Sequence, residues 1–129
     1  MFICIFLSCK NNSKEMECFS HTSGKDSIYL SLTNTDGVIM GVLVYKLYEK
    51  DQNYGTIKGI LAGDTLFANY TFMSEGLESI REVVFLKKGN GYIEGYGEME
   101  DKKGEMVFNN KGSLQFNSLK IFSKTECPN

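Results

Sequence analysis

The sequence predicts an all-β protein, a small antiparallel up-and-down β-barrel of about eight strands. Three observations lead to this prediction. Short runs of apolar and polar residues follow one another at regular spacing, with turn residues between them. Windows with apolar residues at i, i+3, i+4 and i+7, which would indicate amphipathic helices, do not extend over any useful length. The chain has 13 Gly, spread through the expected strands, and a single Pro, at position 128.

Size and composition indicate one soluble globular domain. The 129 residues suffice for a single domain of ordinary size. Hydrophobic residues make up 42% of the chain and charged residues 23%, and nine Phe and seven Tyr supply ample material for one core. The net charge is -2 without a block of like charge. Because nucleic-acid binders usually carry a basic face or stripe, we expect no nucleic-acid partner.

The expected strands are joined by recognisable turns. Asp36-Gly37 is a strong hairpin signal, and Gly89-Asn90 closes a second tight hairpin. The expected strands cover, in order, residues 16–21, 27–33, 38–48, 56–62, 66–73, 79–87, 92–98, 105–108 and 113–123, the last as one bent strand or as two. Connection of each strand to its neighbour favours a barrel over a sandwich, because closure removes the exposed sheet edges.

Glycines inside the expected strands fit the sharp curvature of a small barrel. Gly41, Gly59, Gly95 and Gly97 occupy such positions. In strands, glycine marks bulges and tight bends, where a side chain would interfere. We therefore expect the strands to bend at these four residues.

The chain begins MFICIFLSCKNN, and Leu7-Ser8-Cys9 resembles the lipobox of a bacterial lipoprotein signal, in which small residues precede a lipidated Cys. Seven apolar residues are too few to span a bilayer, which takes about 20. This reading makes residues 1–8 a signal remnant that is removed, residues 9–15 the lipidated Cys9 and its tether, and residues 16–129 the barrel domain. A buried first strand or a chance match are the alternatives, since no Lys or Arg precedes Cys9. A translation start upstream of Met1 would account for that absence.

A lipid on Cys9 would place the protein at the cell envelope, anchored to the outer membrane and facing the periplasm or the surface. A lipoprotein Cys carries several acyl chains, and each buried methylene contributes about 0.8 kcal/mol, so the attachment would be stable. Of the four cysteines, Cys18 and Cys127 then remain in the domain, and an exported compartment permits a disulfide. We expect these two to be bridged, because the first and last strands of a barrel are neighbours. Two free thiols are the alternative.

The segments GTIKG, GDTL, YTFMSEG and REVVFLKKG between residues 55 and 89, together with the lipobox, resemble the small lipocalin-like lipoproteins of Bacteroidetes-type bacteria. The resemblance extends over nearly the whole mature chain. It implies a lipidated, lipocalin-like β-barrel facing the periplasm or the surface. It carries no established activity, so no catalytic residue is transferred from it.

Arg81 is the only arginine, and its planar five-donor fork suits a carboxylate or a phosphate. If Val83 and Phe85 point into the barrel, a period of two points Arg81 inward as well. A buried Arg81 would then need Glu75, Glu78 or a ligand as partner. If Ile80, Val84 and Leu86 point inward instead, Arg81 is solvated. The pattern leaves three roles open: a structural salt bridge, a plain surface residue and a ligand contact.

Tyrosines at strand spacing form the other half of a candidate ligand site. Tyr has an apolar body and a polar tip, which suits the mouth of a cavity, although packing in the core is the commoner role. We name Tyr45 and Tyr70 with Arg81 and Glu75 as the candidate ligand-binding residues. An eight-stranded barrel is either just filled by its side chains or holds one small ligand.

Catalytic and metal chemistry find little support in the sequence. His21 is the only histidine, and it could be paired with Asp26 in a triad, but a surface histidine is the simpler reading. There is no C-x-x-C and no histidine pair, so we expect neither metal nor cofactor. We expect a protein without catalytic activity that binds a small apolar or amphipathic ligand. The alternative is an envelope protein-interaction or enzyme-inhibitor module that acts through exposed loops such as residues 49–54.

Overall fold

The computed structural model describes residues 15–50 and 52–128, and the predicted signal, the lipidated Cys9 and nearly all of the tether lie outside them. The ten strands are β1 Met16–Ser23, β2 Asp26–Thr35, β3 Val38–Lys46, β4 Asn53–Ala62, β5 Thr65–Ser74, β6 Leu77–Lys88, β7 Gly91–Tyr96, β8 Met99–Lys102, β9 Glu105–Phe108 and β10 Gln115–Thr125. A short 3-10 turn, η1, covers Lys111–Ser113.

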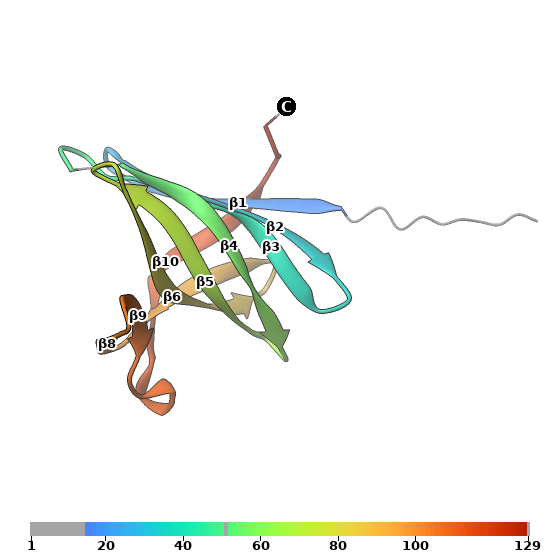
Figure 1. Cartoon of the computed structure of the whole chain (residues 1–129). Helices are drawn as coiled ribbons and strands as arrows, with labels where there is room; N and C mark the ends of the chain where they lie inside the picture. The colour runs from blue at the N-terminus through green and yellow to red at the C-terminus, as the bar shows by residue number, and fades with distance from the viewer. Residues whose placement is uncertain (1–14, 51, 129) are drawn as a thin grey trace, which may run out of the picture.

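Eight of these strands close into an antiparallel β-barrel, which confirms the predicted fold class (Figure 1). Strands β1 to β7 are neighbours in chain order, β10 lies between β7 and β1, and pairing along the whole of β5 and β6 completes the circle. The remaining hairpin, β8 and β9, lies outside the barrel wall and joins it through a short parallel pairing of β9 with β6.

The core of the barrel consists of the inward-facing residues of all eight strands. Its largest fully buried side chains are those of Tyr70, Phe19, Phe85 and Phe122. Aromatic rings meet edge to face within it, with 5.1 Å between the ring centroids of Phe19 and Tyr92. These buried rings favour an interior filled by side chains at the level of the barrel that they occupy.

Two strand glycines lie close to the backbone of a neighbouring strand. A Cβ atom on Gly41 would collide with the carbonyl oxygen of Ser31, and one on Gly59 with that of Phe67. Both collisions involve the backbone of the neighbouring strand, which cannot move aside as a side chain could. A side chain would therefore interfere at both positions.

The predicted strand bounds differ from the structure mainly at the loops. The strand expected at 92–98 ends at Tyr96, and the next strand, β8, begins at Met99. The loop expected at 49–54 lies two residues earlier, at 47–52, because β3 ends at Lys46 and β4 begins at Asn53. The last strand is a single one with an irregular register between Phe116 and Ile121.

The barrel has two different ends, which we name by their contents. At the disulfide end, β1 begins and β10 ends, and tight turns join β2 to β3, β4 to β5 and β6 to β7. At the loop end lie the longer β3–β4 connection and the excursion between β7 and β10 that contains β8, β9 and η1. The candidate functional residues gather at the loop end.

Candidate functional site

A buried carboxylate lies at the centre of the polar residues inside the barrel. Glu94, near the end of β7, is only 2% exposed. It accepts a hydrogen bond of 2.8 Å from the Tyr45 hydroxyl on β3 and one of 3.3 Å from the Tyr96 hydroxyl on β7. The Tyr96 oxygen in turn accepts a hydrogen bond of 3.0 Å from the Lys120 ammonium group. The carboxylate is thus linked to the surface through Tyr96.

Arg81 faces the same region from β6. Val83 and Phe85 are buried in the core, so the strand period points Arg81 inward, as one of the two sequence-based alternatives required. Its guanidinium carbon lies 6.0 Å from the centroid of the Tyr45 ring. Neither of the two ion pairs found among the described residues includes Arg81. The positive charge is therefore close to Glu94 without direct contact between the two groups.

Two polar atoms at the loop end lack a hydrogen-bond partner. Both Arg81 Nε and Asn53 Oδ1 are buried and unpaired within residues 15–50 and 52–128. One is a donor and the other an acceptor. Asn53 is the first residue of β4. Gly55, two residues further along, pairs with the inward-facing Phe72 of β5, so the strand period places Asn53 on the inner face of the wall as well.

Apolar side chains lie beside these polar groups. Phe72 stacks on Tyr70 with 4.7 Å between ring centroids, and Tyr70 meets Tyr45 edge to face at 5.8 Å. Phe72 and Leu47 are only partly buried against the core. The inner face of the loop end thus combines exposed parts of apolar side chains with unpaired polar atoms.

Burial sets the protonation of this cluster. Burial raises the pKa of the Glu94 carboxyl, although the hydrogen bond from Tyr45 and the positive charge of Arg81 oppose the rise. Burial, followed by the negative charge of Glu94, raises the pKa of Tyr45 well above its usual value. Tyr45 therefore keeps its proton, and with it the role of hydrogen-bond donor, to higher pH than a free tyrosine, and Glu94 takes up a proton more readily than an exposed glutamate.

The structure brings three of the four candidate ligand residues together. Tyr70 pairs directly with Arg81 across β5 and β6, and its hydroxyl donates a 2.9 Å hydrogen bond to the carbonyl of Leu43. Tyr45 lies between Tyr70 and Glu94. Glu75 is separate from this group, since it lies in the exposed turn between β5 and β6.

Glu94 is the central residue that the sequence analysis missed. The signal for it was present: the tight turn Gly89-Asn90 pairs Lys88 with Gly91, and the same register places Glu94 opposite Phe85. An inward Phe85 therefore implies an inward Glu94. Asn53 had no comparable signal, because the long connection between β3 and β4 leaves the register of β4 undetermined by the turn.

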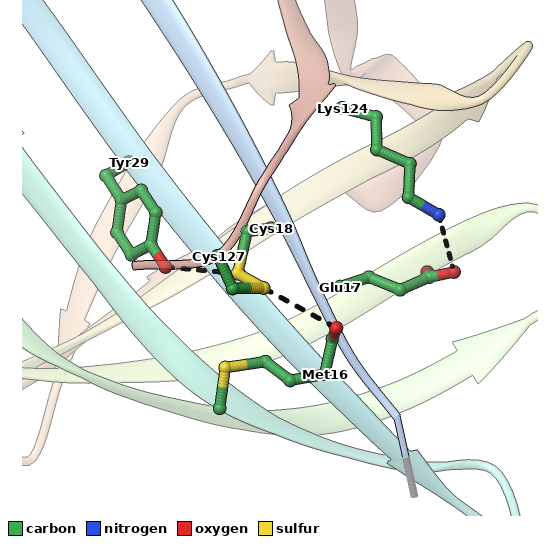
Figure 2. The surroundings of a disulfide bond; sticks show 6 residues. All are labelled: Met16, Glu17, Cys18, Tyr29, Lys124 and Cys127. Carbon is green, nitrogen blue, oxygen red and sulfur yellow. Dashed lines mark hydrogen bonds and ion pairs between the residues drawn. A yellow bond between two sulfur atoms is a disulfide. The ribbon is translucent and has the colours of Figure 1, made fainter. Parts of the chain in front are cut away.

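At the disulfide end, Cys18 and Cys127 are bonded, which confirms the predicted bridge. Their Cα atoms lie 5.2 Å apart, and Cys18 is fully buried on the outer side of β1. Figure 2 shows that the Tyr29 hydroxyl, 3.1 Å from Cys18 Sγ, and the ion pair of Glu17 with Lys124 lie around this bridge. The bridge ties the start of the first strand to the chain just after the last.

The other features considered in the sequence have structural roles. His21 Nδ1 lies 3.0 Å from the Ile121 carbonyl oxygen, and Asp26 accepts a 2.7 Å hydrogen bond from the Tyr48 amide. No group of three or more His, Cys, Asp or Glu side chains within the described part of the chain is arranged to hold a metal ion. In that same part, no helix has the length and apolar character needed to cross a membrane.

Comparison with known proteins gives no relative from which a function could be transferred. No protein family model matches the chain, and neither a curated protein nor a solved structure shows significant similarity to it. The functional argument therefore depends on the residues themselves.

Proposed function

We propose that this protein is a lipid-anchored binding protein of the cell envelope, without catalytic activity, and that its loop end holds the polar head of a small amphipathic ligand. The anchor is proposed from the sequence alone, since Leu7-Ser8-Cys9 lies outside the described residues. The binding site is proposed from the geometry of the loop end.

The observation that carries the proposal is the pair of unpaired polar atoms, Arg81 Nε and Asn53 Oδ1. A buried polar group without a partner costs about 1–3 kcal/mol, so native proteins rarely leave one unexplained. A ligand that offers an acceptor to Arg81 Nε and a donor to Asn53 Oδ1 would satisfy both atoms. The partly buried Phe72 and Leu47 would contact its apolar portion.

The same geometry supports a small ligand with an uncharged polar head. Large aromatic side chains fill the middle of the barrel, so space for the ligand is limited to the loop end. The charges of Arg81 and Glu94 largely cancel there, which favours a head group such as a hydroxyl or an amide over a strongly charged one.

The test is fluorescence titration with a dansyl-labelled fatty acid amide, displaced by an unlabelled monoacylglycerol. We expect the variant Arg81→Met to weaken probe binding about tenfold or more, since a hydrogen bond to a charged group contributes about 1.5–3 kcal/mol. Lys46→Met is the matched control, because Lys46 lies at the loop end of the barrel, as Arg81 does, but is exposed on the outer face of β3. Equal binding by the wild type, Arg81→Met and Lys46→Met, or no binding by any of them, would contradict the proposed site.

A second candidate is a protein-interaction or inhibitor module acting through the β3–β4 loop. The observation that favours it is the exposure of two tyrosines flanking this loop, Tyr48 at 51% and Tyr54 at 58%. Tyrosine is enriched at protein interfaces. Saturable binding of a partner from the envelope would favour this candidate over ligand binding, provided that Tyr48→Ser removes the binding and Arg81→Met does not.

A further inference from the structure

We propose that an aliphatic patch on the outside of the barrel rests on the lipid bilayer, so that the loop end faces the aqueous phase. The patch consists of Met16, Val38, Met40, Val42 and Ile60. This inference deepens the proposed function and rests on its lipid anchor, because the anchor is what brings the patch to a membrane.

The five side chains are exposed although all are apolar. Their exposed fractions are 56% for Met16, 42% for Val38, 55% for Met40, 38% for Val42 and 64% for Ile60. Single exposed apolar residues are ordinary, whereas a contiguous group of them marks a surface that contacts something other than water.

The strand register shows that the patch is contiguous. Val38, Met40 and Val42 are successive outward positions of β3. Ile60 pairs directly with Val38 across β3 and β4. Met16 and Met40 both pair with the same residue of β2, Thr33, one from each side.

The position of the patch indicates the bilayer as its occupant. Met16 is the first residue of β1, so the patch includes the point at which the barrel begins after Cys9 in the sequence. Seven residue steps separate Cys9 from Met16, and a fully extended chain of that length spans at most about 25 Å. A lipidated Cys9 would therefore keep the disulfide end, and the patch with it, close to the membrane surface.

The chemistry of the patch suits the headgroup and acyl-chain boundary. All five side chains are aliphatic or thioether groups. The charged neighbour in the same row is Lys58, which pairs with Met40 across β3 and β4. A lysine can lay its apolar stem along such a surface while its ammonium group stays in water or meets an anionic headgroup.

The test uses the full lipidated protein in phosphatidylethanolamine–phosphatidylglycerol vesicles, with an environment-sensitive fluorophore on Met40→Cys. The control position is Leu77→Cys, which is apolar and 72% exposed but lies at the loop end. With Cys18 and Cys127 bonded, neither native thiol of the barrel takes up the label. We expect nitroxides on the lipid acyl chains to quench the label at position 40 and to leave position 77 unaffected.

Equal accessibility of both labels to an aqueous quencher would overturn the inference. Shielding of position 40 in buffer without detergent or vesicles, in a chain that starts at Glu15 and carries no lipid, would also overturn it, in favour of a second copy on the patch. The mass of the extracted protein tests the anchor separately. An acylated protein with an unshielded position 40 refutes the patch and leaves the anchor intact.

A chain that starts at Glu15 contains all ten strands and the disulfide, and it tests the patch without the anchor. We expect this chain to float with the same vesicles. Met40→Lys should lower the bound fraction about tenfold, because one large apolar side chain is no longer buried in the bilayer. Leu77→Lys should leave the bound fraction unchanged. If this chain floats and the extracted full-length protein proves to be unacylated, the anchor is refuted and the patch is supported. No difference between the two lysine variants would refute the patch.

Discussion

Breaking the bond between Cys18 and Cys127 should lower the free energy of unfolding by about 3–5 kcal/mol. The bridge joins residues 109 positions apart, so it closes almost the whole domain into one loop. In the chain-entropy model a loop of this length contributes about 4.8 kcal/mol at 25 °C, which is an upper limit because residual structure in the unfolded chain reduces it. A loss of that size is a large fraction of the total stability of a small domain.

The local structure explains why the loss should be felt first at one seam of the barrel. Strands β1 and β10 pair over only three positions, Cys18 with Thr125, Phe19 with Lys124 and Ser20 with Ser123. Without the bridge, this short ladder alone joins the two ends of the chain. We therefore expect faster amide hydrogen exchange at the seam than in the long β5–β6 ladder.

The assay is urea unfolding followed by far-UV circular dichroism, since the chain has no Trp to report by fluorescence. The variant Cys127→Ser and the reduced wild type should agree, because both leave Cys18 in its fully buried position. The slope of the free energy against urea should rise, as an uncrosslinked unfolded chain exposes more surface. A loss below about 1 kcal/mol with an unchanged slope would refute the loop-closure reasoning.

Three further predictions concern the barrel and its appendage. Because burial raises the pKa of Glu94, the folded state holds its proton to higher pH than the unfolded state, so its contribution to stability is lost as pH rises through the raised pKa. Glu94→Gln should remove this slope in unfolding experiments carried out at pH values above the usual glutamate pKa. Gly41→Val should lower the melting temperature sharply, because its side chain would collide with the backbone of β2. Glu82→Met should raise hydrogen exchange in β9 without changing global stability, because it removes the carboxylate that accepts a 2.9 Å hydrogen bond from the Phe108 amide.

The sequence was sufficient to predict the elements whose register is set by local rules. The strand expected at 38–48 is present as β3, with Leu43 and Tyr45 at alternate positions in the core, and the glycine-containing turns located the hairpins. The pairing of Cys18 with Cys127 followed from closure of the barrel, which makes the first and last strands neighbours. In each of these cases a local feature, such as strand alternation, a tight turn or barrel closure, allows only one arrangement of the strands.

The candidate site was predicted less well, because its members come from five different strands, β3 to β7. Arg81 could be assigned to one face only after Val83 and Phe85 were known to be buried. The carboxylate near it proved to be Glu94, from the next strand, rather than Glu75 or Glu78, which are closer in sequence and exposed. Side chains that meet across a barrel depend on the register of every strand between them, and a long loop leaves that register free.

The polar cluster at the loop end is costly for the barrel, and this is the strongest argument that it serves binding. Buried charged groups are often replaced by apolar side chains of similar size at no loss of stability, whereas removal of one partner alone is destabilising. We therefore expect the double variant Arg81→Met with Glu94→Gln to unfold in urea at a midpoint no lower than that of Arg81→Met alone, while binding of the dansyl probe is lost in both. If the double variant is less stable than either single variant and still binds the probe, the cluster is structural and the ligand site lies elsewhere.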